Sequence, residues 1–355
     1  MSRCGSMKKT YVLVLAVVLV VIAVALAVLP GLIAPSKPTT PTVATTPATV
    51  TPIYSFKMPT GSAVGSLYIV GQALSAIVSK YNPNIIMVAI PGGGSISNAR
   101  LVGKGDVPIS LSGAIFVHYA YYGLAPFFKN ESYPKLRVVA PIHPNFVGFI
   151  VRADSGIRTI YELAGKRIAV AEPGSGDNAL AVLLLQEAGL WDKVVPLNVG
   201  EPDSWNLLKA GQVDAVIMFT ALPNPSLYEF SMTCPITFAE IPDDLANKIQ
   251  SKYPFLSRAI MPKGTYNGVD RDIQLLKVPM LIIANADAPE DLVYNIVKTY
   301  WTRFDEVKAM AAFLQYVDRT NPLAGISIPL HKGAYKFWVE IGIKVPDALK
   351  PPELK

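Results

Sequence analysis

Short apolar runs alternate with segments of helical periodicity along most of the 355-residue chain. The runs Asn84–Ile90, Val107–Ser112 and Lys166–Glu172 have the length and composition of buried strands. Each is followed by a turn and a segment in which apolar residues recur at helical spacing. Such alternation is typical of α/β proteins, whose ligand sites lie beyond the carboxyl ends of the strands. We therefore predict an α/β fold with mostly parallel sheets.

Further apolar runs extend the same alternation. Leu136–Ile142 and Phe146–Arg152 are predicted as two strands joined at His143-Pro144-Asn145. The other predicted elements are strands at Ile53–Pro59 and Val213–Thr220 and helices at Leu67–Asn82 and Ala179–Leu190.

Three turns rich in Gly and Ser, at residues 60–66, 92–98 and 174–178, each follow a predicted strand and open a predicted helix. Glycine lets a backbone approach a ligand closely, and free N–H groups at a helix start attract a carboxylate or phosphate. Any one of them is equally readable as an ordinary tight turn with a Ser or Asp cap. Three in one chain favour a binding site. None has the spacing of a nucleotide fingerprint.

Side chains suited to catalysis or metal binding are scattered. His118, His143 and His331 show no metal-ligand spacing, and Ser175 stands in G-S-G rather than in the G-x-S-x-G of serine hydrolases. We therefore predict no enzyme activity, no metal site and no cofactor, with the histidines in structural roles. The ring-rich segment His118–Tyr122 is interpreted as packing within its lobe, the alternative being that one ring covers a ligand.

The first 52 residues differ from the rest of the chain. Residues 11–34 carry no charge and are long enough to span a bilayer, and Lys8 and Lys9 place residues 1–10 in the cytoplasm. A cleaved signal peptide is the alternative, although no A-x-A site ends the segment. Residues 35–52 are mostly Thr, Pro, Ala and Val and predict an extended stalk, open to glycosylation. We expect a single-pass anchor in the cell membrane, with the folded domain extracytoplasmic.

Charge and cysteine usage exclude other classes. The net charge is +6 with only 16% charged residues, and no Lys/Arg run resembles a nucleic-acid patch, so nucleic acid is not an expected partner. Cys4 and Cys234 would lie on opposite sides of the membrane, which excludes a disulfide between them within one chain. Cys234 is interpreted as a buried, unreactive thiol.

Several motifs, in order, resemble the solute-binding subunits of TRAP transporters, specifically the TAXI family. T-G-S-A-V-G-S-L-Y at Thr60–Tyr68 looks like the family's opening turn, and G-G-S-I-S-N-A-R-L at Gly93–Leu101 is similar to its helix start. The resemblance covers nearly all of Met58–Leu349, and its later motifs are D-S-G-I…L-A-G-K-R-I within Arg152–Val170, G-S-G at Gly174–Gly176, P-N-P at Pro223–Pro225, G-T-Y-N-G-V at Gly264–Val269 and P-L-H-K-G-A at Pro329–Ala334.

The resemblance implies a two-lobed periplasmic-binding-protein fold of type II, with hinge strands crossing between the lobes. Lobe one is expected at residues 53–148 and 262–355 and lobe two at 149–261, with hinges near residues 144–149 and 259–263. The implied function is capture of a small carboxylate, such as glutamate or 2-oxoglutarate, between the lobes of a monomer. The partner would be a TRAP permease driven by an ion gradient. His331 is interpreted as structural, at the start of a last helix, Gly333–Ile341, that packs on lobe one.

We expect ligand-binding groups from both lobes, with no catalytic residue among them. They are Thr60, Ser62, Gly65, Ser66, Tyr68, Gly94, Ser95, Asn98, Ser112 and Gly113 in lobe one and Gly174, Ser175, Gly176, Asp177, Thr220 and Asn224 in lobe two.

Three departures from the family pattern leave the ligand open. The family commonly has Gln at Ser112, Asp at Ala114 and Thr at Asp177. Asp177 would repel a carboxylate unless it points outward as a helix cap, which is the interpretation favoured here, or pairs with an amine on the ligand. An alternative function is the binding protein of an ATP-driven importer for ligands such as sulfonates or thiamine precursors.

Overall fold

The computed structural model describes residues 54–354. The predicted membrane segment at residues 11–34, the stalk at 35–52 and Cys4 lie outside the described residues. Within residues 54–354, no helix combines the length and the apolar character needed to cross a bilayer.

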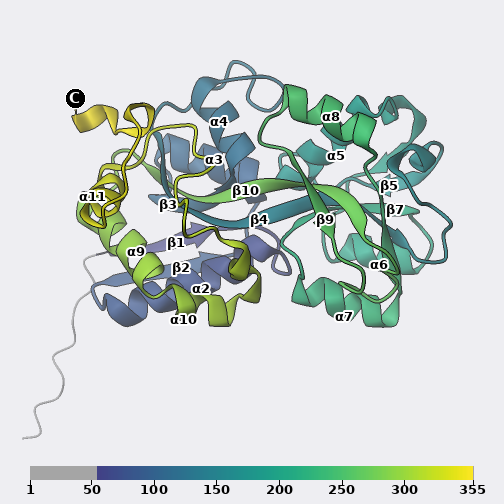
Figure 1. Cartoon of the computed structure of the whole chain (residues 1–355), viewed down its shortest axis with the longest axis horizontal. Coiled ribbons are helices and arrows are strands. Elements are labelled where there is room, and N and C mark those ends of the chain that lie inside the picture. Colours follow the sequence, from purple (N-terminus) through teal and green to yellow (C-terminus); the bar gives the residue numbers. More distant parts are fainter. Residues whose placement is uncertain (1–53, 355) are drawn as a thin grey trace, which may run out of the picture. The chain divides into compact units, whose positions relative to one another are not determined.

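The first lobe is built on a parallel pair of strands and the helices around it (Figure 1). Helix α2 connects the pair, and the three C-terminal helices return to this lobe. Its elements are β1 (Tyr54–Pro59), α2 (Ser66–Tyr81), β2 (Ile85–Ile90), α3 (Gly94–Lys104), β3 (Ile109–Gly113), α4 (Ala114–Tyr122), α9 (Glu290–Thr302), α10 (Phe304–Met310) and α11 (Lys332–Glu340).

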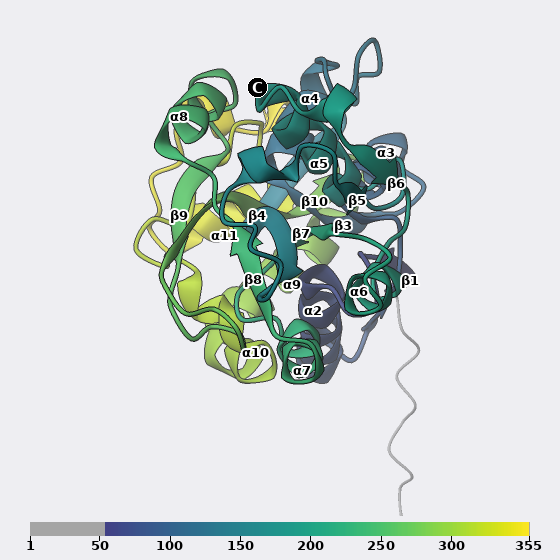
Figure 2. The same cartoon turned by 90° about the vertical axis from the view of Figure 1, so that its right-hand side faces the viewer.

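In the second lobe, helices cover both faces of a sheet. Figures 1 and 2 show α5 and α8 on one side of its strands and α6 and α7 on the other. Its elements are β5 (Arg167–Ala169), α5 (Gly176–Glu187), β6 (Val195–Leu197), α6 (Asp203–Lys209), β7 (Ala215–Thr220), α7 (Pro225–Thr233), β8 (Ile236–Ala239), α8 (Asp243–Lys252) and β9 (Ser257–Met261). Short 3-10 helices occur at Ile160–Leu163, Trp191–Lys193, Ala312–Tyr316, Asp347–Leu349 and Pro352–Leu354.

Two long strands run through both lobes, β4 (Leu136–Arg152) and β10 (Ile273–Asn285) (Figure 1). They pair antiparallel with each other inside a sheet of order β3-β10-β4-β7-β5-β6, with β8 added on β4 and β9 on β10. The prediction of mostly parallel sheets was wrong. Parallel pairs remain at β1–β2, β5–β6 and β5–β7, but every pair made by β4 or β10 is antiparallel.

The predicted break at residues 143–145 is also wrong, because β4 continues through it. Pro144 lies opposite Pro279 of β10, and the register shifts between Pro279 and Leu281. Neither proline has an N–H to donate, so the hydrogen-bond ladder is weakened where the strands pass between the lobes. This is a suitable place for bending.

The second crossing lies further along the chain than residues 259–263. Those residues form the end of β9 and the turn after it, and β9 pairs with the part of β10 at residues 273–277. The crossing itself occurs within β10, which goes on to pair with β3 of the first lobe at Met280–Ala284.

Buried hydrogen bonds hold the last helix, α11, against β4 and the residues before α9. Trp338 donates its indole N–H to the Val139 carbonyl at 3.0 Å. His331 accepts the Gly333 amide proton on Nδ1 at 3.1 Å, so Nε2 carries the proton that it shares with the Ala288 carbonyl at 3.1 Å. Burial lowers the pKa of His331 to about 4, which keeps the ring neutral. The predicted last helix is confirmed, at Lys332–Glu340, and His331 is its N-cap.

Candidate functional site

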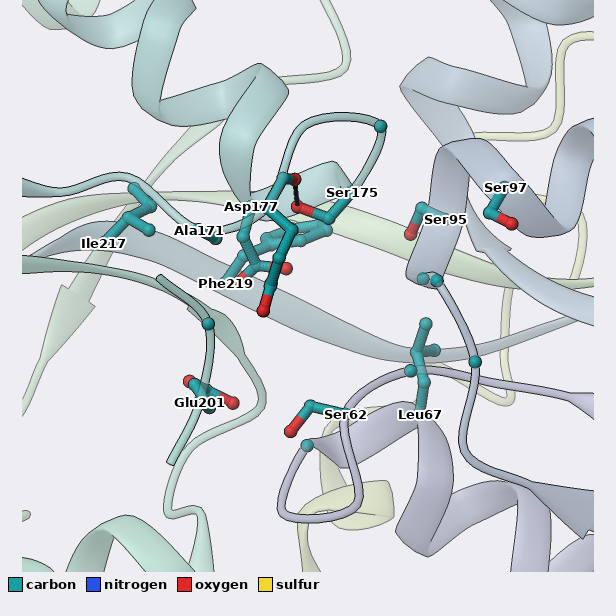
Figure 3. A pocket seen from close by; sticks show the side chains of 18 of the residues that line it. Ser62, Leu67, Ser95, Ser97, Ala171, Ser175, Asp177, Glu201, Ile217 and Phe219 are labelled. Atoms are coloured by element: carbon teal, nitrogen blue, oxygen red, sulfur yellow. Dashed lines mark hydrogen bonds between the residues drawn. The ribbon is translucent and has the colours of Figure 1, made fainter. Parts of the chain in front are cut away.

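A cavity of about 470 Å³ lies between the two lobes. Its first-lobe wall comes from the turns before α2 and α3, and its second-lobe wall from the turn before α5 and the segment before α6. Figure 3 shows Ser62, Leu67, Ser95 and Ser97 on one side of the opening and Asp177 and Glu201 on the other. Asn145 of β4 and Phe219 of β7 complete the lining.

The first-lobe wall consists of two helix starts without side-chain caps. The N-cap residues of α2 and α3 are Gly65 and Gly93, which have no side chain to cap their helices, and the Ser66 amide at the start of α2 donates to the Thr220 hydroxyl instead. Gly94 adopts a φ of +78°, a conformation that glycine reaches without strain. Ser95 accepts the Gly113 amide proton on its hydroxyl at 3.2 Å. The wall therefore presents helix starts, which carry partial positive charge, and serine hydroxyls.

The second-lobe wall begins at the start of α5. Ser175 is the N-cap, accepting the Asn178 amide proton at 3.1 Å and donating its own to the Glu172 carbonyl at 2.8 Å. Since Ser175 is the cap, Asp177 in the first turn is not, and its side chain lines the cavity. The interpretation of Asp177 as an outward-pointing cap was wrong.

Three carboxylates, those of Glu172, Asp177 and Glu201, make this wall acidic. Burial raises the pKa of Asp177 to about 7, and the charge of Glu172 acts in the same direction. Burial also raises the pKa of Glu201 to about 8, followed by the charges of Asp177 and Glu172, while the Ser62 hydroxyl opposes the shift. The Glu172 carboxylate lies against Gly200, where a Cβ would overlap it. The charges of the neighbouring carboxylates thus add to the effect of burial on Asp177 and Glu201.

Two further polar atoms at this wall lack partners. Oε1 of Glu201 is buried without a hydrogen bond, and so is the hydroxyl of Ser204 in the first turn of α6. Ser204 is only 1% exposed and lines the cavity. Buried polar atoms are nearly always hydrogen-bonded in folded proteins, so these two are open positions for a ligand.

Arg100 is the only lysine or arginine among the described residues that line the cavity. Its guanidinium group is held by Glu131 through a pair of hydrogen bonds, at 3.0 Å from Nε and 2.9 Å from Nη2. The charge of Arg100 is therefore already compensated, and the acidic wall faces no free cation across the cavity.

Half of the predicted site residues line the cavity, namely Ser62, Gly65, Ser66, Gly94, Ser95, Gly174, Ser175 and Asp177. Other predicted site residues instead form hydrogen bonds that stabilise the turns of the first lobe. Thr60 donates its hydroxyl to the Ile90 carbonyl at 2.8 Å, and Asn98 donates its amide to the carbonyls of Thr60 and Leu111. Ser112 donates to the Ser95 carbonyl at 2.9 Å. Tyr68, Gly113 and Gly176 also lie outside the cavity lining.

Thr220 and Asn224 join the lobes instead of lining the cavity. The Ser66 amide donates to the Thr220 hydroxyl oxygen at 3.3 Å, and the Asn224 side chain donates to the Val64 carbonyl at 2.9 Å. A Cβ on Gly94 would also come within 3.8 Å of the Gly176 amide nitrogen. Hydrogen bonds thus connect the two walls of the cavity directly.

The sequence analysis did not select Glu172, Glu201, Ser204, Asn145 and Phe219. Glu172 is the last residue of the strand predicted at Lys166–Glu172 and follows the observed β5, and Glu201 follows β6 after a short loop. Side chains just after strand ends lie at the edge where α/β ligand sites form. Their position just after strand ends is the sequence feature from which both carboxylates could have been predicted as site residues.

The remaining predicted residues have structural surroundings. His118 pairs with Ser327 at 3.0 Å and packs against Tyr122 and Phe255. His143 is fully buried against Phe313, and burial lowers its pKa to about 3. Cys234 is free and buried, and burial raises the pKa of its thiol. Over residues 54–354, no three His, Cys, Asp or Glu side chains converge in a way that would hold a metal ion.

Two solved structures are similar to this chain over most of its length. The protein MatC of Rhodopseudomonas palustris, with bound malate, is 17% identical and aligns over 82% of this chain and 97% of its own, with a TM-score of 0.51. The alkanesulfonate-binding protein SsuA of Xanthomonas axonopodis pv. citri, bound to MOPS, is 15% identical over 84% of this chain and 96% of its own, with a TM-score of 0.44. The fold is an α/β periplasmic-binding-protein-like fold with a mixed sheet.

The family assignment rests on the sequence as a whole. The model of the NMT1-like family matches residues 58–342, which include both lobes and both crossing strands. The chain therefore belongs to the NMT1-like family.

Proposed function

We propose that this chain is the extracytoplasmic solute-binding protein of a transporter, which closes its lobes on a small polar solute and delivers it to a membrane permease. The observation that carries the proposal is the cavity between the lobes, lined by groups from both and bridged by β4 and β10. A cavity of about 470 Å³ suits a small metabolite. Binding, not turnover, is the role that this arrangement supports.

Closure explains how such a site would bind and release. The lobes are joined by crossing strands with a weakened ladder at Pro144 and Pro279 and by a few hydrogen bonds such as that of Ser66 to Thr220. A solute that contacts both walls stabilises the closed state by its differential affinity for that state. An open state with separated walls would let it leave.

The finer assignment is to the TAXI type, with a TRAP permease as partner. It is supported by the ordered motifs from Thr60–Tyr68 to Pro329–Ala334. The proposed anchor at residues 11–34 would keep the domain beside that permease at high effective concentration. The proposed solute carries a carboxylate, because the start of α3, which has no side-chain cap, faces the cavity.

Uptake measurements test this proposal. The full chain would be expressed together with a TRAP permease or, separately, with an ATP-driven permease, and entry of radiolabelled solutes would be followed in whole cells. For a TRAP system, uptake should stop when the ion gradient is collapsed and persist when ATP alone is depleted. The opposite pattern would assign the chain to an ATP-driven importer. Absence of any solute-dependent thermal shift in the purified full chain would contradict solute binding itself.

A further inference from the structure

The second-lobe wall of the cavity has an electrostatic character that a purely anionic solute does not match. Glu172, Asp177 and Glu201 gather there, and Arg100 is engaged by Glu131. A dicarboxylate spanning the cavity would bring one of its ends against these groups. Like charges in a partly buried site repel strongly, because water screens them poorly there.

Independent of the charges, this wall has hydrogen-bonding positions that none of residues 54–354 fills. The Ser204 hydroxyl, in a residue that is 1% exposed, has no partner, and neither does Oε1 of Glu201. A carboxylate oxygen is an acceptor when ionised, and a hydroxyl oxygen accepts through its lone pairs. Both are therefore matched by a group with several N–H donors.

The opposite wall has the complementary character. The start of α3, at Gly93, has no side-chain cap, and the hydroxyls of Ser62, Ser95 and Ser97 lie on that side (Figure 3). Helix starts favour an anion. The cavity is thus polarised, with a positive potential from the first lobe and a negative one from the second.

We infer that the solute is a small zwitterion of the amino-acid type, whose cationic nitrogen binds among Glu172, Asp177, Glu201 and Ser204 while its carboxylate meets the start of α3. This inference rests on the proposed function and names its substrate class. Such a solute contacts both lobes with opposite charges, so closure is favoured only when both ends are present. A 2-oxo acid has the carboxylate but lacks the cation, and it leaves the acidic wall unpaired.

Matched pairs of probes that differ only at the nitrogen-bearing carbon provide the test. Binding of L-glutamate and 2-oxoglutarate, L-alanine and pyruvate, and L-leucine and 4-methyl-2-oxopentanoate to the full chain would be measured by calorimetry at pH 7.5. At least one amino acid should bind at least tenfold more tightly than its 2-oxo partner. Asp177→Asn and Glu201→Gln should each reduce that preference at least fivefold. Glu229→Gln, on the exposed surface of α7 in the same lobe, should leave it unchanged.

The outcomes separate this inference from the proposed function. Equal or tighter binding of the 2-oxo acids overturns the zwitterion but leaves solute binding intact. Tighter binding of putrescine or Ca²⁺ than of every amino acid also overturns it, because either result shows that the carboxylate end is not required. If no probe of any class binds and no metabolite co-purifies with the full chain, the solute-binding function itself fails.

Discussion

The backbone amide of Ser66, at the start of α2, donates a hydrogen bond to the side-chain oxygen of Thr220, at the end of β7, across the boundary between the lobes. Thr220 also accepts from the Asn224 side chain at 3.0 Å, and the Ser66 hydroxyl donates to Asn145 of β4 at 2.9 Å. Asn145 in turn donates to the Phe219 carbonyl at 3.0 Å. This buried network therefore connects both walls of the cavity to a crossing strand.

Removing the oxygen at its centre should favour the open state. Thr220→Val keeps the volume but leaves the buried Ser66 amide, and one of the two N–H groups of the Asn224 side chain, without an acceptor, at a cost of about 1–3 kcal/mol in the closed state. We expect solute affinity to fall about tenfold and small-angle scattering to show a larger radius of gyration. Thr233→Val, which removes an exposed hydroxyl on α7, is the matched control. Unchanged solute affinity would show that these hydrogen bonds do not stabilise the closed state.

The approach of the lobes on the other side of the cavity depends on a missing side chain. A Cβ on Gly176 would lie 3.0 Å from Cε2 of Phe116 and 3.2 Å from Cβ of Ser95, both in the first lobe. Gly176→Ala should therefore hold the walls apart and weaken solute binding at least fivefold, with little change in the melting temperature of the unliganded protein. Thr233→Ala, on the exposed surface of α7 and outside the cavity lining, should bind normally. Equal losses in both variants would argue against a closure effect.

The sequence located the first-lobe turns and the start of α5 because Gly and Ser clusters after apolar runs report local geometry. Ser62, Ser95 and Asp177 were found in this way, and all three line the cavity. The orientation of Asp177 was not accessible, since Ser175 and Asp177 both stand where a cap could be. Which one caps the helix depends on burial by the other lobe.

Long-range pairing was the other part that local patterns could not predict. β4 and β10 are more than a hundred residues apart in the chain, and nothing in either strand specifies an antiparallel partner. The two prolines in facing positions, Pro144 and Pro279, read locally as breaks. Glu201 was missed for a similar reason, because a Glu in a loop reads as a surface residue until the first lobe covers it.

The acidic wall should make the unliganded protein less stable as the pH rises. The native pKa values of Asp177 and Glu201 are raised to about 7 and about 8, so the native state holds more protons than the unfolded state between about pH 4 and 8. Burial of this pair therefore does not lower the free energy of unfolding below about pH 4, and it lowers that free energy by its full contribution above about pH 8. Relative to wild type, Glu201→Gln should gain about 1–2 kcal/mol in free energy of unfolding between pH 5 and 8.5.

Chemical denaturation across that range measures the gain. Comparing variant with wild type matters because His118, His143 and His331, with lowered pKa values, give an opposite slope at lower pH. Glu229→Gln should show no pH-dependent gain. A constant difference between Glu201→Gln and wild type would mean that Glu201 is ionised throughout.

His331 should matter for stability and not for solute recognition. It is fully buried, binds the Ala288 carbonyl and the Gly333 amide, and lies far along the chain from every residue that lines the cavity. His331→Ala would leave both groups unpaired and a void beside α11, so we expect a loss of about 2–4 kcal/mol in unfolding free energy. Solute affinity of the folded fraction should stay within twofold. A large loss of affinity without loss of stability would place His331 in recognition instead.

The pH dependence of solute affinity discriminates between the two kinds of solute. A cationic nitrogen stabilises the ionised forms of Asp177 and Glu201, so its binding expels protons, and affinity for an amino acid should rise from pH 6 to 8.5. An anion prefers the protonated forms, so affinity for a 2-oxo acid should fall over the same range. The groups that face this pair are Glu172 on the same wall and Arg100, held by Glu131, on the other.

Calorimetry in buffers of different ionisation enthalpy should detect about one proton released per amino acid near pH 7. Proton uptake on amino-acid binding would contradict the pairing of its nitrogen with these carboxylates.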